Sequence, residues 1–170
     1  GLLELKSGQT LFLDEGAVVY ATVKAYEADN ISILGHGILD NSRNKETIFF
    51  EACEDFNDEA VNNAHREHTV QLEYCTGIRI DGITIRDSLV YNIRPVCCKD
   101  IDIRNVKISG CWRHNSDGID MHTCVNVGID NCFLRTFDDC ICVKGFDYTQ
   151  DEADMYHNGI SYDFFRNVRV

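Results

Sequence analysis

The chain has 170 residues, of which 44% are apolar and 26% charged, so it can form one globular domain with a sizeable core and does not have a disordered composition. Its formal net charge of −12 argues against nucleic acid and anionic membranes as partners. No apolar run approaches the ~20 residues of a membrane-spanning helix, and the N-terminus lacks the basic-then-apolar pattern of a signal peptide.

Five stretches share one pattern of two short alternating strands joined by a polar or glycine corner. In chain order they are NISILGHGILD (30–40), GIRIDGITIRDS (77–88), DIDIRNVKISG (100–110), NVGIDNCFLRT (126–136) and ISYDFFRNVRV (160–170). GITI (82–85) recurs as NVKI (105–108), and RNVKI (104–108) recurs as DNCFL (130–134), which are steps in the range of solenoid repeats. A β-propeller is excluded because its blades need ~40 residues per repeat. A helix is excluded because the glycine and polar corners interrupt any stripe of apolar residues at helical spacing.

The fold class that this pattern predicts is all-β, a parallel β-helix with about three short strands per coil and inward Ile, Val, Leu and Cys. We expect a single domain over residues 1–170. Because the chain begins and ends inside the repeating pattern, we expect it to be a piece of a longer helix. Two polar stretches, 40–68 and 145–159, predict inserted loops. The second lengthens the step from DNCFL (130–134) to RNVRV (166–170), and long excursions on a solenoid usually lie on its binding face.

Nine cysteines are an odd number for a disulfide framework, and no pair of CxxC motifs is present. We therefore expect most of them to be buried free thiols, which favours a reducing compartment, and we predict no zinc site and no cofactor.

Three aspartates dominate the second half of the chain. Aligning DGIDM (117–121) on DCICV (139–143) places Asp117 over Asp139 on neighbouring coils, about 4.8 Å apart along the axis. Asp138, one residue earlier, should project to a different side. Two unpaired carboxylates at about 5 Å repel by ~3 kcal/mol at an effective dielectric near 20, so the cluster needs a proton, a cation or a function. Ordinary turn residues and a calcium cluster are the alternatives.

A carboxylic acid opposite ionised carboxylates is the arrangement that protonates a glycosidic oxygen and activates water. At this point NSDGID and DDCICVKG resemble the Asn-Thr-Asp and Asp-Asp motifs of glycoside hydrolase family 28, the polygalacturonases. The resemblance extends upstream through RDSLVYNIRPVCCKDIDIRNVKI, ISILGHGILDN and SGQTLFLDEGAVVYA. It implies a right-handed parallel β-helix, Asp138 as general acid, and Asp117 with Asp139 as the water-activating pair. It also implies inversion, no metal, and a secreted or periplasmic enzyme acting on a polysaccharide or oligosaccharide that can contain uronates.

The family's later Gly-His-Gly and Arg-x-Lys motifs would be expected past residue 170, so this sequence does not show them. GHG at 35–37 lies in an early coil, before the acids, and is interpreted as a corner. For substrate binding the candidates are Lys144, which follows the acid pair closely, and Arg113, His114 and Asn115, which precede Asp117.

We predict structural roles for two other residues. His122 is expected at a coil corner, and Trp112 is expected to pack in the core or at its edge rather than to stack on a sugar. The alternative function is a non-catalytic carbohydrate-binding or structural β-helix module. A lyase or epimerase would need a calcium cluster and a nearby base, and the sequence contains no such group.

Overall fold

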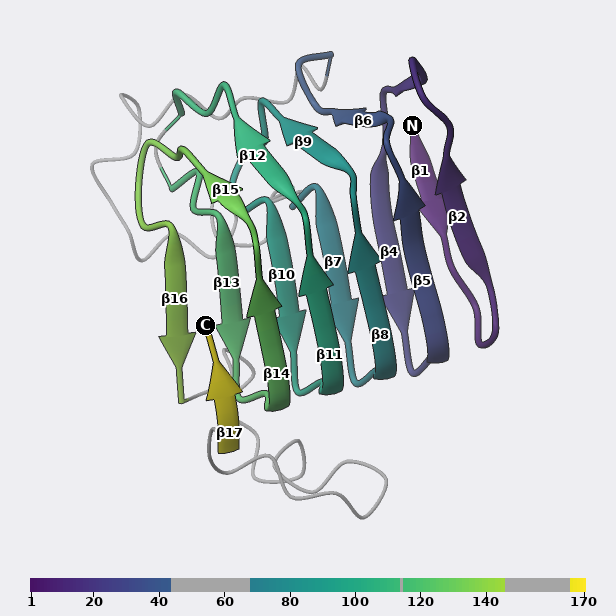
Figure 1. The fold of residues 1–170 in the computed structure, drawn as a ribbon, viewed down its shortest axis with the longest axis vertical. Coiled ribbons are helices and arrows are strands. Elements are labelled where there is room, and N and C mark those ends of the chain that lie inside the picture. Colours follow the sequence, from purple (N-terminus) through teal and green to yellow (C-terminus); the bar gives the residue numbers. More distant parts are fainter. Residues whose placement is uncertain (44–67, 114, 146–165) are drawn as a thin grey trace, which may run out of the picture.

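The structure is a computed structural model that describes residues 1–43, 68–113, 115–145 and 166–170. Within these ranges the chain forms strands that stack in three parallel sheets, as Figure 1 shows. Each complete coil contributes one strand to each sheet, which is the predicted parallel β-helix. No helix long and apolar enough to cross a membrane occurs among the described residues.

The sheets follow one another around the coil in a constant order. The first sheet contains β1 (Leu2–Glu4), β4 (Thr22–Tyr26), β7 (Val70–Glu73), β10 (Ile93–Val96), β13 (Ile119–His122) and β16 (Ile141–Lys144). The second contains β2 (Thr10–Leu13), β5 (Asp29–Gly35), β8 (Thr76–Asp81), β11 (Lys99–Arg104), β14 (Val125–Asp130) and β17 (Arg166–Arg169). The third contains β3 (Val18–Val19), β6 (Ile38–Asp40), β9 (Thr84–Arg86), β12 (Lys107–Ser109) and β15 (Phe133–Leu134).

The predicted register is confirmed in the central coils and wrong at the last one. Ile85 lies opposite Ile108, and Ile108 lies opposite Leu134, as the alignment of the repeats predicts. Arg166 instead pairs with Val125 in the second sheet, so RNVRV does not continue DNCFL in the third. The predicted alignment failed there because short alternating strands resemble one another whichever sheet they belong to.

Inward side chains of the coils form one continuous apolar core. In the second sheet they stack in two buried columns on the inner face: Ile31, Ile78, Ile101 and Val127 in one column, and Ile33, Ile80, Ile103 and Ile129 in the other. Burying a side chain of this size stabilises the fold by about 1.5–3 kcal/mol, so these columns hold the coils in register.

The corners between the second and third sheets share a left-handed backbone conformation. Gly35, Gly82, Asn105 and Asn131 occupy this position on successive coils with φ values of 116°, 85°, 54° and 51°. Glycine and asparagine tolerate this region best. The asparagines also form a ladder, because Asn105 Nδ2 donates to Asp81 Oδ1 at 2.7 Å and Asn131 Nδ2 donates to Asn105 Oδ1 at 2.7 Å. GHG at 35–37 is therefore the corner between β5 and β6, as predicted.

Gly82→Ala is expected to lower the free energy of unfolding by roughly 3 kcal/mol or more. A Cβ at this position would lie 2.4 Å from the Gly35 carbonyl oxygen, on a left-handed backbone. Gly8→Ala is the matched control, since Gly8 has a φ of 76° but no atom within 4 Å of the new Cβ, so only the conformational loss of about 1 kcal/mol remains. Urea unfolding measures both variants, and equal losses would contradict the importance of the close approach at Gly82.

Both predicted insertions lie largely outside the described residues. Their edges do not, and here the prediction needs a correction. Asp40 belongs to β6 and is 3% exposed, and its carboxylate pairs with Arg86 at 2.9 Å on the next coil. His68 is also buried. The polar residues at the edges of the 40–68 stretch are thus part of the coil, where a partner on the neighbouring coil makes burial of a charge tolerable.

Candidate active site

The three aspartates lie in the connections that lead from the third sheet into the first. Ile119 lies opposite Ile141, and the Gly118 N–H donates to the Asp139 carbonyl oxygen at 2.8 Å. The register that places Asp117 over Asp139 is therefore the predicted one. Gly118 permits this approach, because a Cβ there would lie 2.3 Å from the Cys140 carbonyl oxygen.

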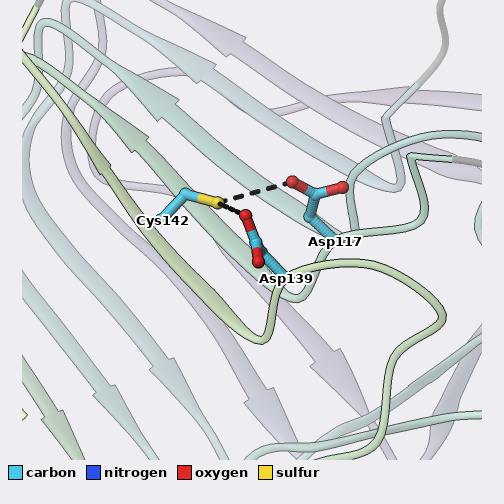
Figure 2. Close-up of side chains that lie close together, drawn as sticks. All are labelled: Asp117, Asp139 and Cys142. Carbon is cyan, nitrogen blue, oxygen red and sulfur yellow. Dashed lines mark hydrogen bonds between the residues drawn. The ribbon is translucent and has the colours of Figure 1, made fainter.

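The carboxylates of Asp117 and Asp139 converge on the thiol of Cys142 (Figure 2). Cys142 Sγ lies 3.4 Å from Asp117 Oδ2 and 3.3 Å from Asp139 Oδ2. Asp117 is 4% exposed, whereas Asp139 is exposed at the surface. A single thiol proton therefore lies between two acceptors that belong to adjacent coils.

Asp138 is exposed, and its side chain makes a local contact that is separate from this cluster. Its Oδ1 accepts the backbone N–H of Asp139 at 3.0 Å, and its carbonyl oxygen accepts the Thr136 hydroxyl at 2.6 Å. These two bonds hold the connection between β15 and β16 in a tight turn. An exposed carboxyl group on such a turn is accessible to a large substrate.

A fourth aspartate, Asp120, anchors a buried polar group next to the cluster. It is fully buried in β13, with Lys144 Nζ 2.6 Å from its Oδ2 and His122 Nε2 2.7 Å from its Oδ1. Lys144 comes from β16, opposite His122 in the sheet register. The group therefore ties together the two coils that also carry the three predicted acids.

This arrangement gives the neighbouring carboxyl groups of Asp117 and Asp120 very different pKa values. Burial and the adjacent Asp120 carboxylate raise the pKa of Asp117 to about 7. Burial would also raise the pKa of Asp120, but the contacts with His122 and Lys144 outweigh it and hold that pKa well below its ordinary value. Burial lowers the pKa of His122 and raises the pKa of the Cys142 thiol, so both are neutral at pH 7. The repulsion expected between Asp117 and Asp139 is relieved below about pH 7 by a proton on Asp117, while the charge of Asp120 is compensated by Lys144.

The preceding coil supports the site from behind. Asn92 is fully buried, and both its backbone N–H, at 2.9 Å, and its Nδ2, at 2.7 Å, donate to the Asp117 carbonyl oxygen. Tyr91 stacks on His68 with ring centroids 4.8 Å apart, and the Lys144 ammonium lies 4.7 Å from the Tyr91 ring centroid. By sheet register one position on four successive coils is occupied by His68, Tyr91, Asp117 and Asp139.

The predicted substrate-binding residues divide into two groups. Lys144 lies beside the acids and is 24% exposed. The Arg113 guanidinium instead contacts Asp87, with Nη1 3.1 Å from its carbonyl oxygen, and stacks on Trp112. Asn115 is partly exposed and adopts a left-handed φ of 55° two residues before Asp117, while His114 lies outside the described residues.

The structure makes two interpretations from the sequence more specific. Trp112 is 59% exposed and lies beside the Arg113 guanidinium, which fits packing at the edge and not in the core. His122 is the last residue of β13, directly before the corner at Thr123 with its φ of 52°, and its Nε2 lies 2.7 Å from Asp120 Oδ1. The buried polar group that it joins depends on the direction of the side chain, which residue type alone does not specify.

Sequence reasoning missed four residues of the site: Tyr91, Asn92, Asp120 and Cys142. The signal for two of them was present, because the alignment that places Asp117 over Asp139 also places Asp120 opposite Cys142. Asn92 and Tyr91 lie one coil earlier and follow from the same register extended to that coil.

Among the described residues, Asp117, Asp139 and Cys142 are also the group that could hold a metal ion, with ligand atoms within 4.8 Å of one another. Chemically, the site combines an accessible carboxyl group, a stacked pair of carboxyl groups with one proton, and a partly exposed ammonium. Such a set can transfer protons to and from a bound substrate and orient a water molecule.

Comparison with known proteins identifies relatives of this chain. The sequence model of the glycosyl hydrolases family 28 matches residues 7–156. A probable polygalacturonase of Vitis vinifera is 34% identical over 80 residues, covering 46% of this chain and 16% of the relative. A polygalacturonase of Gossypium barbadense is 29% identical over 126 residues, covering 71% of this chain and 29% of the relative. The chain thus spans less than a third of the length of these curated relatives.

Solved structures share the fold. A hyperthermoactive exopolygalacturonase from Thermotoga maritima superposes with a TM-score of 0.68 at 22% identity, covering 83% of this chain and 43% of that one. A polygalacturonase from Erwinia carotovora gives a TM-score of 0.69 at 18% identity, covering 83% and 46%. A putative glycosyl hydrolase from Parabacteroides merdae gives 0.65 at 19% identity, covering 98% and 75%.

Proposed function

Because this chain belongs to glycosyl hydrolase family 28, we propose that the protein it represents hydrolyses glycosidic bonds in a pectin-like polysaccharide. The observation that carries this proposal is the stacking of Asp117 on Asp139 across adjacent coils, with Asp138 beside them. The relatives named as polygalacturonases support the choice of substrate class. A role as turn residues alone would not require two acids stacked at one angular position on adjacent coils, with a third acid beside them.

In the proposed mechanism the exposed Asp138 is the general acid. Its carboxyl group donates a proton to the glycosidic oxygen while the bond from that oxygen to the anomeric carbon breaks. Asp117 and Asp139 hold a water molecule on the opposite face of the sugar and take up its proton as it attacks. Because attack and departure occur on opposite faces, the product has inverted anomeric configuration.

Substrate binding is assigned to the partly exposed ammonium of Lys144 and to Asn115, Arg113 and His114 before the first acid. Lys144 Nζ is already 2.6 Å from Asp120 Oδ2, so most of its charge is compensated. We expect it to contribute a directed hydrogen bond to a sugar carboxylate or hydroxyl group rather than a long-range attraction.

The dependence of kcat/KM on pH is expected to change slope near pH 7. Water activation needs the carboxylate form of Asp117, and burial together with Asp120 raises the pKa of this group to about 7. Because the mechanism also needs a protonated general acid, the whole profile should be bell-shaped. Initial rates on polygalacturonate between about pH 4 and pH 8 measure this. A profile without a change of slope near pH 7 would contradict a role for ionised Asp117.

Release of reducing ends from polygalacturonate tests the function itself, and proton NMR of the first products tests inversion. The expected result is hydrolysis with the inverted anomer formed first. Binding of the polysaccharide without cleavage would instead favour a non-catalytic carbohydrate-binding module. Cleavage that yields the retained anomer would overturn the assigned roles of Asp117 and Asp139.

A further inference from the structure

We propose that Asp117, Asp139 and Cys142 form a binding site for one soft divalent cation such as Zn²⁺ or Cd²⁺, and that its occupation blocks the reaction centre. The site holds two carboxylate oxygens and one sulfur from two adjacent coils, all within 4.8 Å of one another. Sequence reasoning argued against zinc because paired CxxC motifs are missing, whereas this site needs only one cysteine. Cation binding itself does not depend on the proposed hydrolysis, but the block does.

The two sulfur–oxygen distances in the group are close to those of tetrahedral coordination, and the two carboxylate oxygens lie within 4.8 Å of each other. Zinc bonds of about 2.3 Å to sulfur and about 2.1 Å to oxygen place these ligand atoms roughly 3.6 Å apart. The Cys142 Sγ lies 3.4 Å from Asp117 Oδ2 and 3.3 Å from Asp139 Oδ2. Small shifts of side-chain torsion would therefore admit the ion, without movement of either coil. Three protein ligands leave the fourth position open to water.

The three ligands also lack a cation of their own, because the nearby ammonium of Lys144 pairs with Asp120. The one thiol proton of Cys142 can be donated to only one of the two carboxylates at a time, and Asp117 Oδ1 is buried without a hydrogen-bond donor. Asp117 is 4% exposed, so bulk water does not satisfy this atom. A buried carboxyl group whose donor is one shared thiol proton must hold a proton or a cation. A divalent ion at the centre of the three ligands would replace the proton that Asp117 holds in the metal-free chain.

The ligand set determines which cations fit. Carboxylates alone would favour calcium or magnesium, which prefer six or more oxygen ligands. A thiolate favours softer ions, and its position beside two carboxylates suits zinc and cadmium. On binding, the Cys142 thiol and the carboxyl group of Asp117 both release their protons to the buffer, because metal ligands must be deprotonated. The ion would then hold both carboxylates that are proposed to activate water.

Cadmium binding tests the proposal directly, because a cadmium–thiolate bond gives an ultraviolet charge-transfer band. Titration of the folded chain with Cd²⁺ should show this band, and equilibrium dialysis should find Zn²⁺ bound at one ion per site. Cys142→Ser and Asp139→Asn should each weaken binding at least about tenfold. Cys140→Ala is the matched control, since Cys140 is an exposed thiol two residues away and outside the cluster. This variant should bind as the wild type does.

The possible outcomes are distinct. Binding that is unchanged in Cys142→Ser, or lost equally in Cys140→Ala, overturns the proposed site. Asp139 is exposed, so its variant keeps the test decisive if Cys142→Ser does not fold, which circular dichroism reports. Zn²⁺ should inhibit hydrolysis over the same concentration range in which it binds. Binding without any hydrolysis in the metal-free chain would refute the proposed function and leave the cation site standing.

Discussion

Asp138→Asn is expected to lower kcat for reducing-end release by about 10²–10⁴-fold, with KM changed little. Asparagine has nearly the same size as aspartate. Its amide oxygen can still accept the hydrogen bond from the Asp139 N–H. What it loses is the proton for the leaving oxygen. Because the residue is exposed and contributes no buried contact, the free energy of unfolding should change by less than about 0.5 kcal/mol.

Asp130→Asn is the control for this substitution. Asp130 is another exposed aspartate at the end of a strand, β14, in the second sheet, away from the first-sheet connections. Its replacement should leave kcat unchanged. Full activity of Asp138→Asn on polygalacturonate would remove Asp138 from the role of general acid, and a comparable loss in Asp130→Asn would indicate a general effect of charge.

Asp117→Asn is expected to abolish hydrolysis while raising the free energy of unfolding at pH 8 by roughly 2–4 kcal/mol. In the folded chain, burial and Asp120 raise the pKa of Asp117 to about 7 from an ordinary value of 3.8. Between these pH values the folded chain keeps a proton that the unfolded chain has released, so stability falls as the pH rises. Above about pH 7 the folded chain must hold a buried, ionised Asp117 next to Asp120.

Asparagine at position 117 avoids this loss of stability because its side chain does not ionise. The stability of the variant should therefore match the wild type near pH 4, exceed it by a growing margin between pH 4 and about pH 7, and keep that margin above pH 7. Thermal and urea unfolding at the two pH values measure the difference. A variant that is less stable than the wild type at pH 8 would contradict the burial of an unfavourable charge at this position.

Asp120→Asn provides a comparison of opposite sign, three residues along the chain. Its carboxylate has a pKa held below the ordinary value by His122 and Lys144, so its contribution to stability is present above about pH 4 and is lost as the pH falls through the folded pKa. At pH 8 the substitution leaves Lys144 without the carboxylate that lies 2.6 Å away and should cost about 3 kcal/mol. The stability measured as a function of pH should therefore respond in opposite directions to replacement of Asp117 and of Asp120.

The fold could be predicted from the sequence because a solenoid repeats its local rules. Alternating apolar residues, such as Ile101 and Ile103, predict strands with one buried face. Corners that need glycine or asparagine recur at a constant distance from them, as at Asn105. Together these features specify the coil length, and the coil length predicts that Asp117 lies over Asp139.

The partners of the polar side chains could not be predicted in the same way. Asp120 and Lys144 are distant in the chain and meet only because β13 and β16 pair in register. The alignment contained that pairing, but it did not indicate that Asp120 would be fully buried. The register of β17 also failed, since a strand of four residues does not identify its own sheet.

Residue order was therefore enough to deduce the coil, the stacking of two acids and the place of the third beside them. It was not enough to show that Asp117 keeps a proton, that Asp120 does not, and that the thiol of Cys142 lies between two carboxylates; the folded chain was needed for these. The repeat of strands and corners is a property of residues that are near one another in the chain, so it can be recognised in the sequence alone. The pKa of a carboxyl group depends on how much water surrounds it and on which charges lie within a few ångströms, and contacts between coils set both.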